Sequence, residues 1–202
     1  MQENNLGIKL KYSVASIINN VDWNGIIGSI PEYQYLQKRA FEDEQYLKRF
    51  VAFYKIRFFK KKSDKQLHYF KKQLLSTSSG NKVEFDRIFM RLSDYSGKSQ
   101  LSYASKIIAT ANPEMAVVDK HVLKNLSMHR SYIKNKKDRY KKDVELYNNI
   151  NSFIKDLCRK KEGKELIRAF DKRTKLIPEA LKICAVKKID FMLWRMRELN
   201  KK

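Results

Sequence analysis

Lys106 is a side chain whose chemistry depends on whether the fold buries it. It stands between Ala104 and Ile107 in an apolar run, and residues 101–110 are predicted to form a short helix. Burial penalises a charged ammonium group, so a Lys106 that points inward would have a lowered pKa and could act as an amine nucleophile. The alternative, which the sequence alone favours, is an ordinary lysine whose stem lies along the core while its ammonium group reaches water.

Asp119 stands immediately before a second predicted helix, over residues 120–128. At that position its carboxylate can accept hydrogen bonds from the unpaired N–H groups of the first helical turn. Val118 before it and Leu123 after it are placed as a hydrophobic staple. A helix cap therefore explains Asp119 without any chemistry, and the sequence favours this role over that of a catalytic acid.

The segment Val117–Val122, which reads Val-Val-Asp-Lys-His-Val, resembles the helix-hairpin-helix DNA glycosylases. Those enzymes carry a Val-Asp-x-His-Val type segment with a catalytic Asp, and bifunctional members use a Lys shortly upstream as nucleophile. The resemblance implies that Asp119 stabilises positive charge developing at the sugar or positions a water. It also implies that a Lys amine, here Lys106, adds to C1′ and forms a Schiff base.

The hairpin before this segment departs from the family's pattern of two glycines and a Lys before a helical Ala. Here Gly97-Lys98-Ser99-Gln100 precedes the helix, and aligning Ala104 with the family's Ala puts Ser102 at the position of the lyase Lys. Lys106 lies about one helical turn away. The family's glycines let backbone amides approach a DNA phosphate, so the departure affects both the nucleophile and the phosphate contact.

A longer resemblance covers most of the chain and implies no activity. Three segments are similar to parts of an uncharacterised family of small bacterial proteins, namely residues 53–57, 104–113 and 186–194.

The chain is strongly basic, with 44 Lys and Arg against 22 Asp and Glu and a formal net charge of +22. Such a charge attracts nucleic acid, and the excess of Lys over Arg favours phosphate contacts over base readout. A Lys-rich solvated surface, an acidic protein and a membrane surface are the alternatives. The candidate phosphate contacts lie around the hairpin and at the start of a long helix: Lys98, Lys106, Lys120, Lys124, Lys136, Lys137 and Arg139.

Several other functional classes lack support. The three histidines are scattered, with no Cys or paired acid at metal-ligand spacing, and no Gly-rich phosphate loop is present. The acidic run 42–44 fits a helix N-terminus better than a metal site. Cys158 and Cys184 are too few for a disulfide scaffold. With no secretory leader and no apolar run of about 18 residues, we expect a cytoplasmic protein without metal or cofactor.

Composition and periodicity predict one all-α domain over residues 1–202, or two helical lobes sharing an interface. Hydrophobic residues make up 43% of the chain, which has 6 Gly and 3 Pro. The most regular helix is predicted over about 134–157, and residues 1–30 fit a strand and a helix equally well. Further helices are predicted over 31–59 with a break near Ala40, over 64–75 and 83–96, after Gly163, from Pro178, and over 187–198.

Three functional hypotheses follow. The first is DNA binding without strong sequence preference on a multi-helix, glycosylase-like helix-hairpin-helix scaffold, with DNA favoured over RNA. The second is an active DNA glycosylase or AP lyase that uses Asp119 and Lys106. The third is a host-defence or interaction protein whose basic surface meets an acidic protein or RNA.

Overall fold

The protein is all-helical over the residues that the computed structural model describes, which are 7–38, 44–56, 68–70, 72–73 and 84–196. No strand occurs in these ranges, and Val21 and Met196 form an isolated antiparallel bridge. The helices are α1 (Val14–Asn20), α2 (Trp23–Ile27), α3 (Ile30–Lys38), α4 (Glu44–Phe53), α6 (Phe85–Ser96), α7 (Leu101–Ala111), α8 (Lys120–Asn125), α9 (Lys136–Arg159), α10 (Lys161–Arg173), the 3₁₀ helix η2 (Pro178–Lys182) and α11 (Ala185–Arg195).

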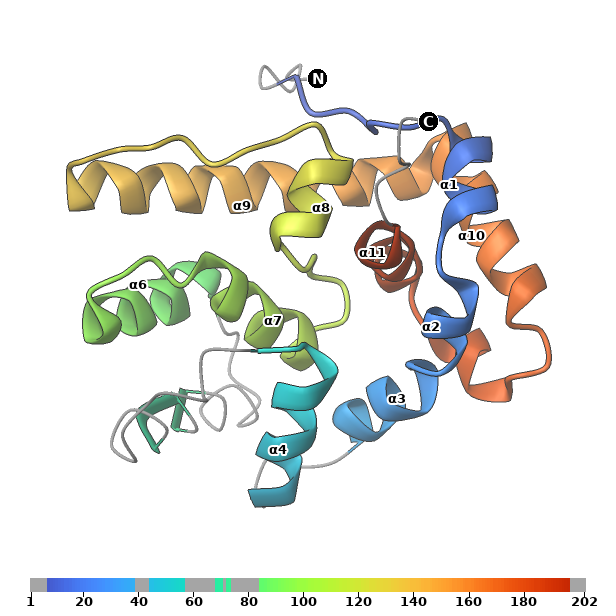
Figure 1. Ribbon diagram of the computed structural model, residues 1–202, viewed down its shortest axis with the longest axis horizontal. Helices are drawn as coiled ribbons and strands as arrows, with labels where there is room; N and C mark the ends of the chain where they lie inside the picture. The colour runs from blue at the N-terminus through green and yellow to red at the C-terminus, as the bar shows by residue number, and fades with distance from the viewer. Residues whose placement is uncertain (1–6, 39–43, 57–67, 71, 74–83, 197–202) are drawn as a thin grey trace.

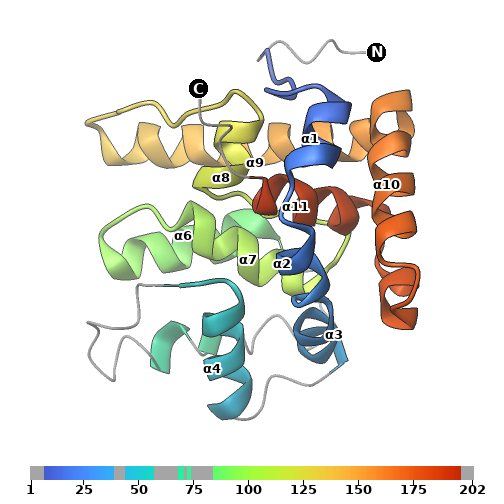
Figure 2. The ribbon, with the colours of Figure 1, turned by 45° about the vertical axis from the view of Figure 1, so that its right-hand side comes forward.

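Helix α11 lies in the middle of the molecule and the other helices pack around it (Figures 1 and 2). It contacts α1, α2, α8, α9 and α10, and nine consecutive residues from Val186 to Trp194 are buried. The long helix α9 runs along one side of the molecule (Figure 1). Its predicted apolar face is confirmed, because Tyr140, Tyr147 and Ile150 are buried against the core.

A tight turn joins α6 and α7. Gly97 ends α6 in the left-handed region, with φ of 66°, a conformation that glycine adopts without the steric cost of a Cβ. The Ser93 hydroxyl accepts a hydrogen bond from the Gln100 N–H at 3.0 Å, which closes the turn. The two helices pack against each other, so the sequence-predicted end of a helix at Gly97 is confirmed.

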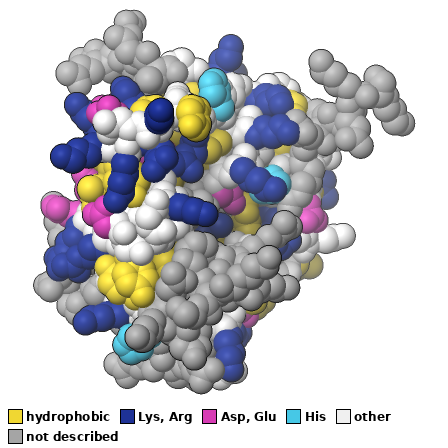
Figure 3. Space-filling model, turned by 60° about the vertical axis from the view of Figure 1, so that its left-hand side comes forward, with side chains coloured by type: hydrophobic (Ala, Val, Ile, Leu, Met, Phe, Trp, Pro, Cys, Tyr) yellow, Lys and Arg dark blue, Asp and Glu magenta, His cyan; other side chains and the backbone are white. Residues whose placement is uncertain are grey.

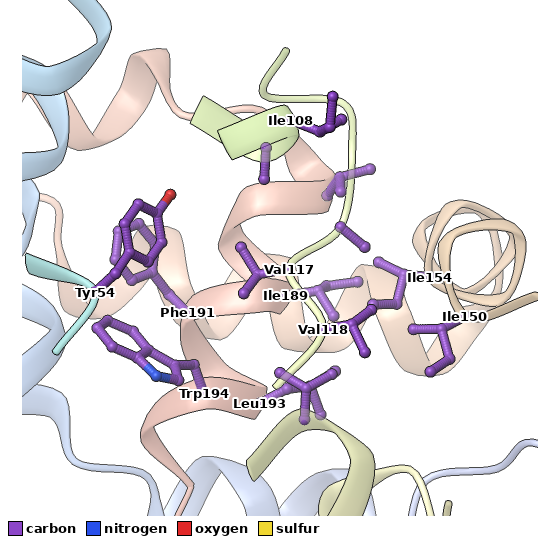
Figure 4. Close-up of a cluster of buried hydrophobic side chains, with 14 of the residues drawn as sticks. Tyr54, Ile108, Val117, Val118, Ile150, Ile154, Ile189, Phe191, Leu193 and Trp194 are labelled. Carbon is purple, nitrogen blue, oxygen red and sulfur yellow. The ribbon is translucent and has the colours of Figure 1, made fainter. Parts of the chain in front are cut away.

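The extended segment Ala116–Asp119, here called the threaded segment, passes between α7, α9 and α11. Figure 4 shows Val117 and Val118 beside Ile189 of α11 and Ile154 of α9. Buried backbone N–H groups need partners, and side chains from three helices supply them. Asn151 accepts from the Ala116 N–H at 3.0 Å, Asp190 from Val117 at 2.9 Å and Ser105 from Val118 at 3.0 Å.

Several sequence predictions need correction or lie outside the described residues. The N-terminal region, left between strand and helix, forms α1 and α2 from Val14 onward, and residues 7–13 form neither a strand nor a helix. Pro178 begins a 3₁₀ helix, and the helix predicted over 187–198 begins earlier, at Ala185. The region predicted to be helical over 31–59 forms two helices, α3 and α4. The predicted break at Ala40, the acidic residues 42–43 and most of the helix predicted over 64–75 lie outside the described residues.

Asn125 ties the end of α8 to the end of α11, and its replacement tests this connection. Its buried side-chain amide donates to the Leu193 carbonyl at 2.7 Å and to the Met196 carbonyl at 3.2 Å. We expect Asn125→Leu to lower the free energy of unfolding by about 1–3 kcal/mol, because buried acceptors lose their donor. Urea unfolding would measure this, with the exposed Asn148→Leu as control; equal stability of the two variants would contradict the prediction.

Candidate functional site

A cavity of about 590 Å³ lies between the end of α4, the start of α7, the threaded segment and α8. This size is typical of pockets that hold small ligands or parts of larger ones. The four cationic side chains among its described lining residues face one carboxylate, that of Asp119, so the cavity favours an anionic ligand. The lining residues are Tyr54, Lys55, Ile56, Gln100, Leu101, Ser102, Tyr103, Lys106, Val118, Asp119, Lys120, His121, Leu123, Arg130 and Trp194.

Lys106 is buried at the edge of this cavity, which corrects the sequence-based preference for a lysine that reaches water. The residue is 7% exposed. Its ammonium group donates to the Tyr54 carbonyl at 3.3 Å, near the C-terminus of α4, and lies 3.9 Å from Asp119 Oδ2. Burial lowers the pKa of Lys106 from its ordinary value, and the Asp119 charge opposes that shift without cancelling it.

Asp119 divides its two carboxylate oxygens between two tasks. Oδ1 accepts hydrogen bonds from the backbone N–H groups of His121 at 2.9 Å and Val122 at 3.1 Å, so the predicted helix cap is confirmed. Oδ2 is the oxygen that faces the Lys106 ammonium group. The capping bonds hold the carboxylate in one orientation while its second oxygen stays available to the cavity.

The contacts of the Lys106 nitrogen are long for a buried ion pair. A charge-assisted N–H···O bond is typically about 2.7–2.9 Å, whereas the two oxygens near this nitrogen lie at 3.3 and 3.9 Å. Weak compensation for burial favours the neutral amine, which carries a lone pair. A neutral amine at this position has the chemistry of a nucleophile, and the Asp119 carboxylate lies 3.9 Å away as a group that can accept a proton.

The sequence-predicted phosphate contacts fall into three groups. Lys106 and Lys120 line the cavity. Lys98 is exposed in the turn between α6 and α7, and Lys124 is exposed on α8. Lys and Arg side chains are spread over the face shown in Figure 3 and outnumber the Asp and Glu side chains there.

The remaining predicted contacts lie at the start of α9, outside the cavity lining. Lys136 pairs with Asp94 of α6 at 3.0 Å, which brings the start of α9 beside the end of α6. Lys137 is exposed in the same helical turn. Arg139 is half-buried with its guanidinium 5.8 Å from the Tyr140 ring centre. Of these three side chains, Lys137 presents its charge most freely to a polyanion.

Sequence reasoning missed several residues of the cavity. Lys55 and Arg130 are exposed cations on its lining, and Tyr54 and Trp194 form an aromatic wall with ring centres 6.4 Å apart. Lys55 adopts a left-handed conformation with φ of 50°, which is strained for a residue other than glycine. Basic and aromatic residues are common throughout this chain, so their types gave no signal that would single these four out.

Among the described residues, neither the cysteines nor the acidic side chains form a second candidate site for catalysis or metal binding. Burial raises the pKa of the Cys158 thiol to about 11 and also raises that of Cys184, which disfavours the reactive thiolates. Among the described residues, no three His, Cys, Asp or Glu side chains come together as metal ligands. Within the same ranges, no helix has the length and apolar character needed to cross a membrane.

The capping role of Asp119 predicts a difference between two substitutions. Asp119→Asn keeps an oxygen that can accept from His121 and Val122, whereas Asp119→Ala removes it. We expect Asp119→Ala to lose about 1 kcal/mol of unfolding free energy and Asp119→Asn a few tenths. Chemical unfolding of both variants would measure this, and an Ala variant as stable as the wild type would contradict the cap.

The lowered pKa of Lys106 predicts how its replacement depends on pH. Below its lowered pKa, Lys106 is charged in the folded and the unfolded state, so the folded state bears the full cost of burying the charge. As pH rises through the lowered pKa toward the ordinary value of 10.5, the folded protein gives up its proton first and that cost disappears. Lys106→Met should therefore be most stabilised relative to wild type at pH values below the lowered pKa, and this advantage should shrink as the pH rises toward 10.5.

Unfolding free energies of the two proteins, measured across this pH range, would test the prediction. A difference that does not change with pH would contradict it.

Comparisons with known proteins leave this site to be interpreted from its geometry. No protein-family model, curated protein or solved structure matches the chain.

Proposed function

We propose that the protein is a DNA-binding enzyme that forms a Schiff base with a nucleotide sugar through Lys106, as in a DNA glycosylase or AP lyase. The observation that carries this proposal is the Lys106 amine, buried with a lowered pKa beside Asp119 Oδ2 in a cavity whose charged lining residues are mainly cations. Perturbed titratable groups in a cavity are characteristic of functional sites.

The chemistry begins with the neutral amine. Nζ of Lys106 forms a bond to C1′ while the bond from C1′ to the base breaks, and that electron pair leaves with the base, which takes a proton from water. The attacking nitrogen gives a proton to Asp119. The C1′–O4′ bond then breaks with its pair on O4′, which takes this proton, and the nitrogen lone pair completes the Schiff base.

Two routes lead on from the Schiff base. Water can add at C1′ and release the Lys106 amine, leaving an abasic sugar. Alternatively, loss of a C2′ proton forms a double bond to C3′ and expels the 3′-phosphate with the bonding pair, which is the lyase step. In both routes Asp119 Oδ2 is placed to hold or return a proton near Nζ.

The cavity supports this enzyme hypothesis over DNA binding alone. A phosphate contact needs an exposed cation, and the chain has many on its surface, whereas burying Lys106 costs stability. A site that retains such a cost next to a solvent-accessible cavity is explained by chemistry at that nitrogen. The exposed cations Lys98, Lys120 and Lys124 then bind the backbone of the same DNA.

Trapping with borohydride tests the proposal. We expect a covalent adduct with a duplex that contains an abasic site, because borohydride reduces the Schiff base to a stable amine. Lys106→Met should give no adduct, and Asp119→Asn should slow its formation on the order of 100-fold. The exposed Lys164→Met on α10 is the matched control, and peptide mapping would distinguish Lys106 from Lys55 and Lys120.

Binding to the same duplex, measured across a range of salt concentrations, separates the hypotheses. Salt-sensitive binding without an adduct would overturn the Lys106 chemistry and leave a DNA-binding protein. An absence of binding at low salt would overturn both, and the search would turn to an acidic protein partner.

A further inference from the structure

Arg130 is held in a fixed orientation at the cavity. It lies in the loop between α8 and α9, and its Nε donates to Asp143 Oδ1 at 2.9 Å while Nη2 donates to Asp143 Oδ2 at 2.5 Å. Nη2 also donates to the Ser99 hydroxyl at 2.8 Å, and that hydroxyl donates to Asp143 Oδ2 at 2.5 Å. Two parallel bonds to one carboxylate fix the plane of a guanidinium group.

The anchoring carboxylate is buried and the guanidinium is not. The Asp143 side chain is 6% exposed and the Arg130 side chain 39%. Among the described residues, these bonds use Nε and Nη2, and none is formed by the third guanidinium nitrogen, Nη1. The protein therefore binds the Nε and Nη2 edge of the Arg130 guanidinium, and the N–H groups of Nη1 remain to donate to a ligand.

The same residue lines the cavity that contains Lys106 and Asp119. Lys55 and Lys120 line it as well, so positive charge remains after Asp143 has neutralised Arg130. A preoriented guanidinium loses little conformational freedom on binding, and the two N–H groups of Nη1 can donate to the oxygens of a phosphate. Because Arg130 and Lys106 line the same cavity, one ligand can bring a phosphate to Arg130 and its attached sugar to Lys106.

We propose that Arg130 Nη1 binds a phosphate of the nucleotide whose sugar reaches Lys106, with Asp143 and Ser99 as positioning residues. This inference rests on the proposed function and narrows its substrate class to phosphorylated deoxyribose, as found in a polynucleotide. Free nucleosides and unphosphorylated sugars are then poor substrates. Ser99 belongs to the turn between α6 and α7, so the phosphate site lies where this turn meets the loop that carries Arg130.

Two small sugars test the phosphate site apart from DNA binding. The open-chain aldehydes of 2-deoxyribose and 2-deoxyribose 5-phosphate each form an imine with a lysine amine and lose water, and borohydride donates a hydride to the imine carbon. We expect the wild type to trap the phosphorylated sugar at a concentration at least about tenfold lower, since a charge-assisted contact is worth that ratio or more.

Variants assign this preference to Arg130. Arg130→Gln should trap both sugars at similar concentrations, and so should Arg130→Lys, because an ammonium group cannot pair with both Asp143 oxygens and also hold a donor in a fixed position for the ligand. The exposed Arg159→Gln on α9 is the matched control and should keep the preference. Arg130→Gln leaves the buried Asp143 without its partner, so the double variant Arg130→Gln/Asp143→Asn provides a form with no unpaired charge.

The outcomes separate this inference from the function on which it rests. Equal trapping of both sugars by the wild type would overturn the phosphate site and leave the Lys106 chemistry in place. If the wild type traps neither sugar, the proposed Lys106 chemistry is overturned. The salt dependence of duplex binding then tests whether Arg130 contacts a phosphate. Loss of one phosphate contact in the double variant should reduce the slope of log K against log salt by about 0.9, and an unchanged slope would overturn the phosphate site.

Discussion

The site depends on how the buried backbone of the threaded segment finds its hydrogen-bond partners. Residues 116–119 have no helical neighbours to pair with, and an unpaired buried N–H group costs about as much as a lost hydrogen bond. Side chains of α7, α9 and α11 supply the acceptors, through Ser105, Asn151 and Asp190. These bonds fix the positions of the three helices relative to the threaded segment. They also place Asp119, the last residue of that segment, against α7.

Burying the Asp190 carboxylate, which accepts one of these bonds, carries a desolvation cost. This carboxylate is fully buried and pairs with Lys187 at 2.7 Å on the same helix, while Oδ2 also accepts from Val117. Removing one partner from such a pair leaves an unpaired buried charge, which is strongly destabilising. The pair therefore fixes the path of the threaded segment, and with it the distance between Asp119 and Lys106.

A comparison of two buried lysines, Lys187 and Lys106, shows how packing sets lysine chemistry. The Lys187 ammonium group lies 2.7 Å from the Asp190 carboxylate, and this buried ion pair has a structural role. Lys106 has its carboxylate at 3.9 Å, because Asp119 uses its other oxygen to cap α8 and cannot move closer without losing that cap. Burial without close pairing lowers the pKa of Lys106, and a lone pair on a buried amine is useful where a cavity gives a substrate access to it.

The sequence by itself determined the local features of this protein. The periodicity of α9, the end of α6 at Gly97 and the cap at Asp119 all depend on residues within a few positions of one another, so an all-α fold and a helix after Asp119 could be predicted. The sequence also identified Lys106 and Asp119 as candidates. It favoured an exposed Lys106, however, because a lysine beside apolar neighbours in a helix can usually extend to water.

The tertiary structure decided what surrounds those residues. Lys106 is buried because the end of α4, about 50 positions earlier, places the Tyr54 carbonyl over its nitrogen. Arg130, Asp143 and Ser99 come together from a loop, a helix and a turn. They are too far apart in the sequence for any local sequence pattern to predict that they meet. Capping and helical periodicity depend on residues a few positions apart, whereas the burial and pKa of Lys106 and the bonds that orient Arg130 depend on groups that only the packing of distant segments brings together.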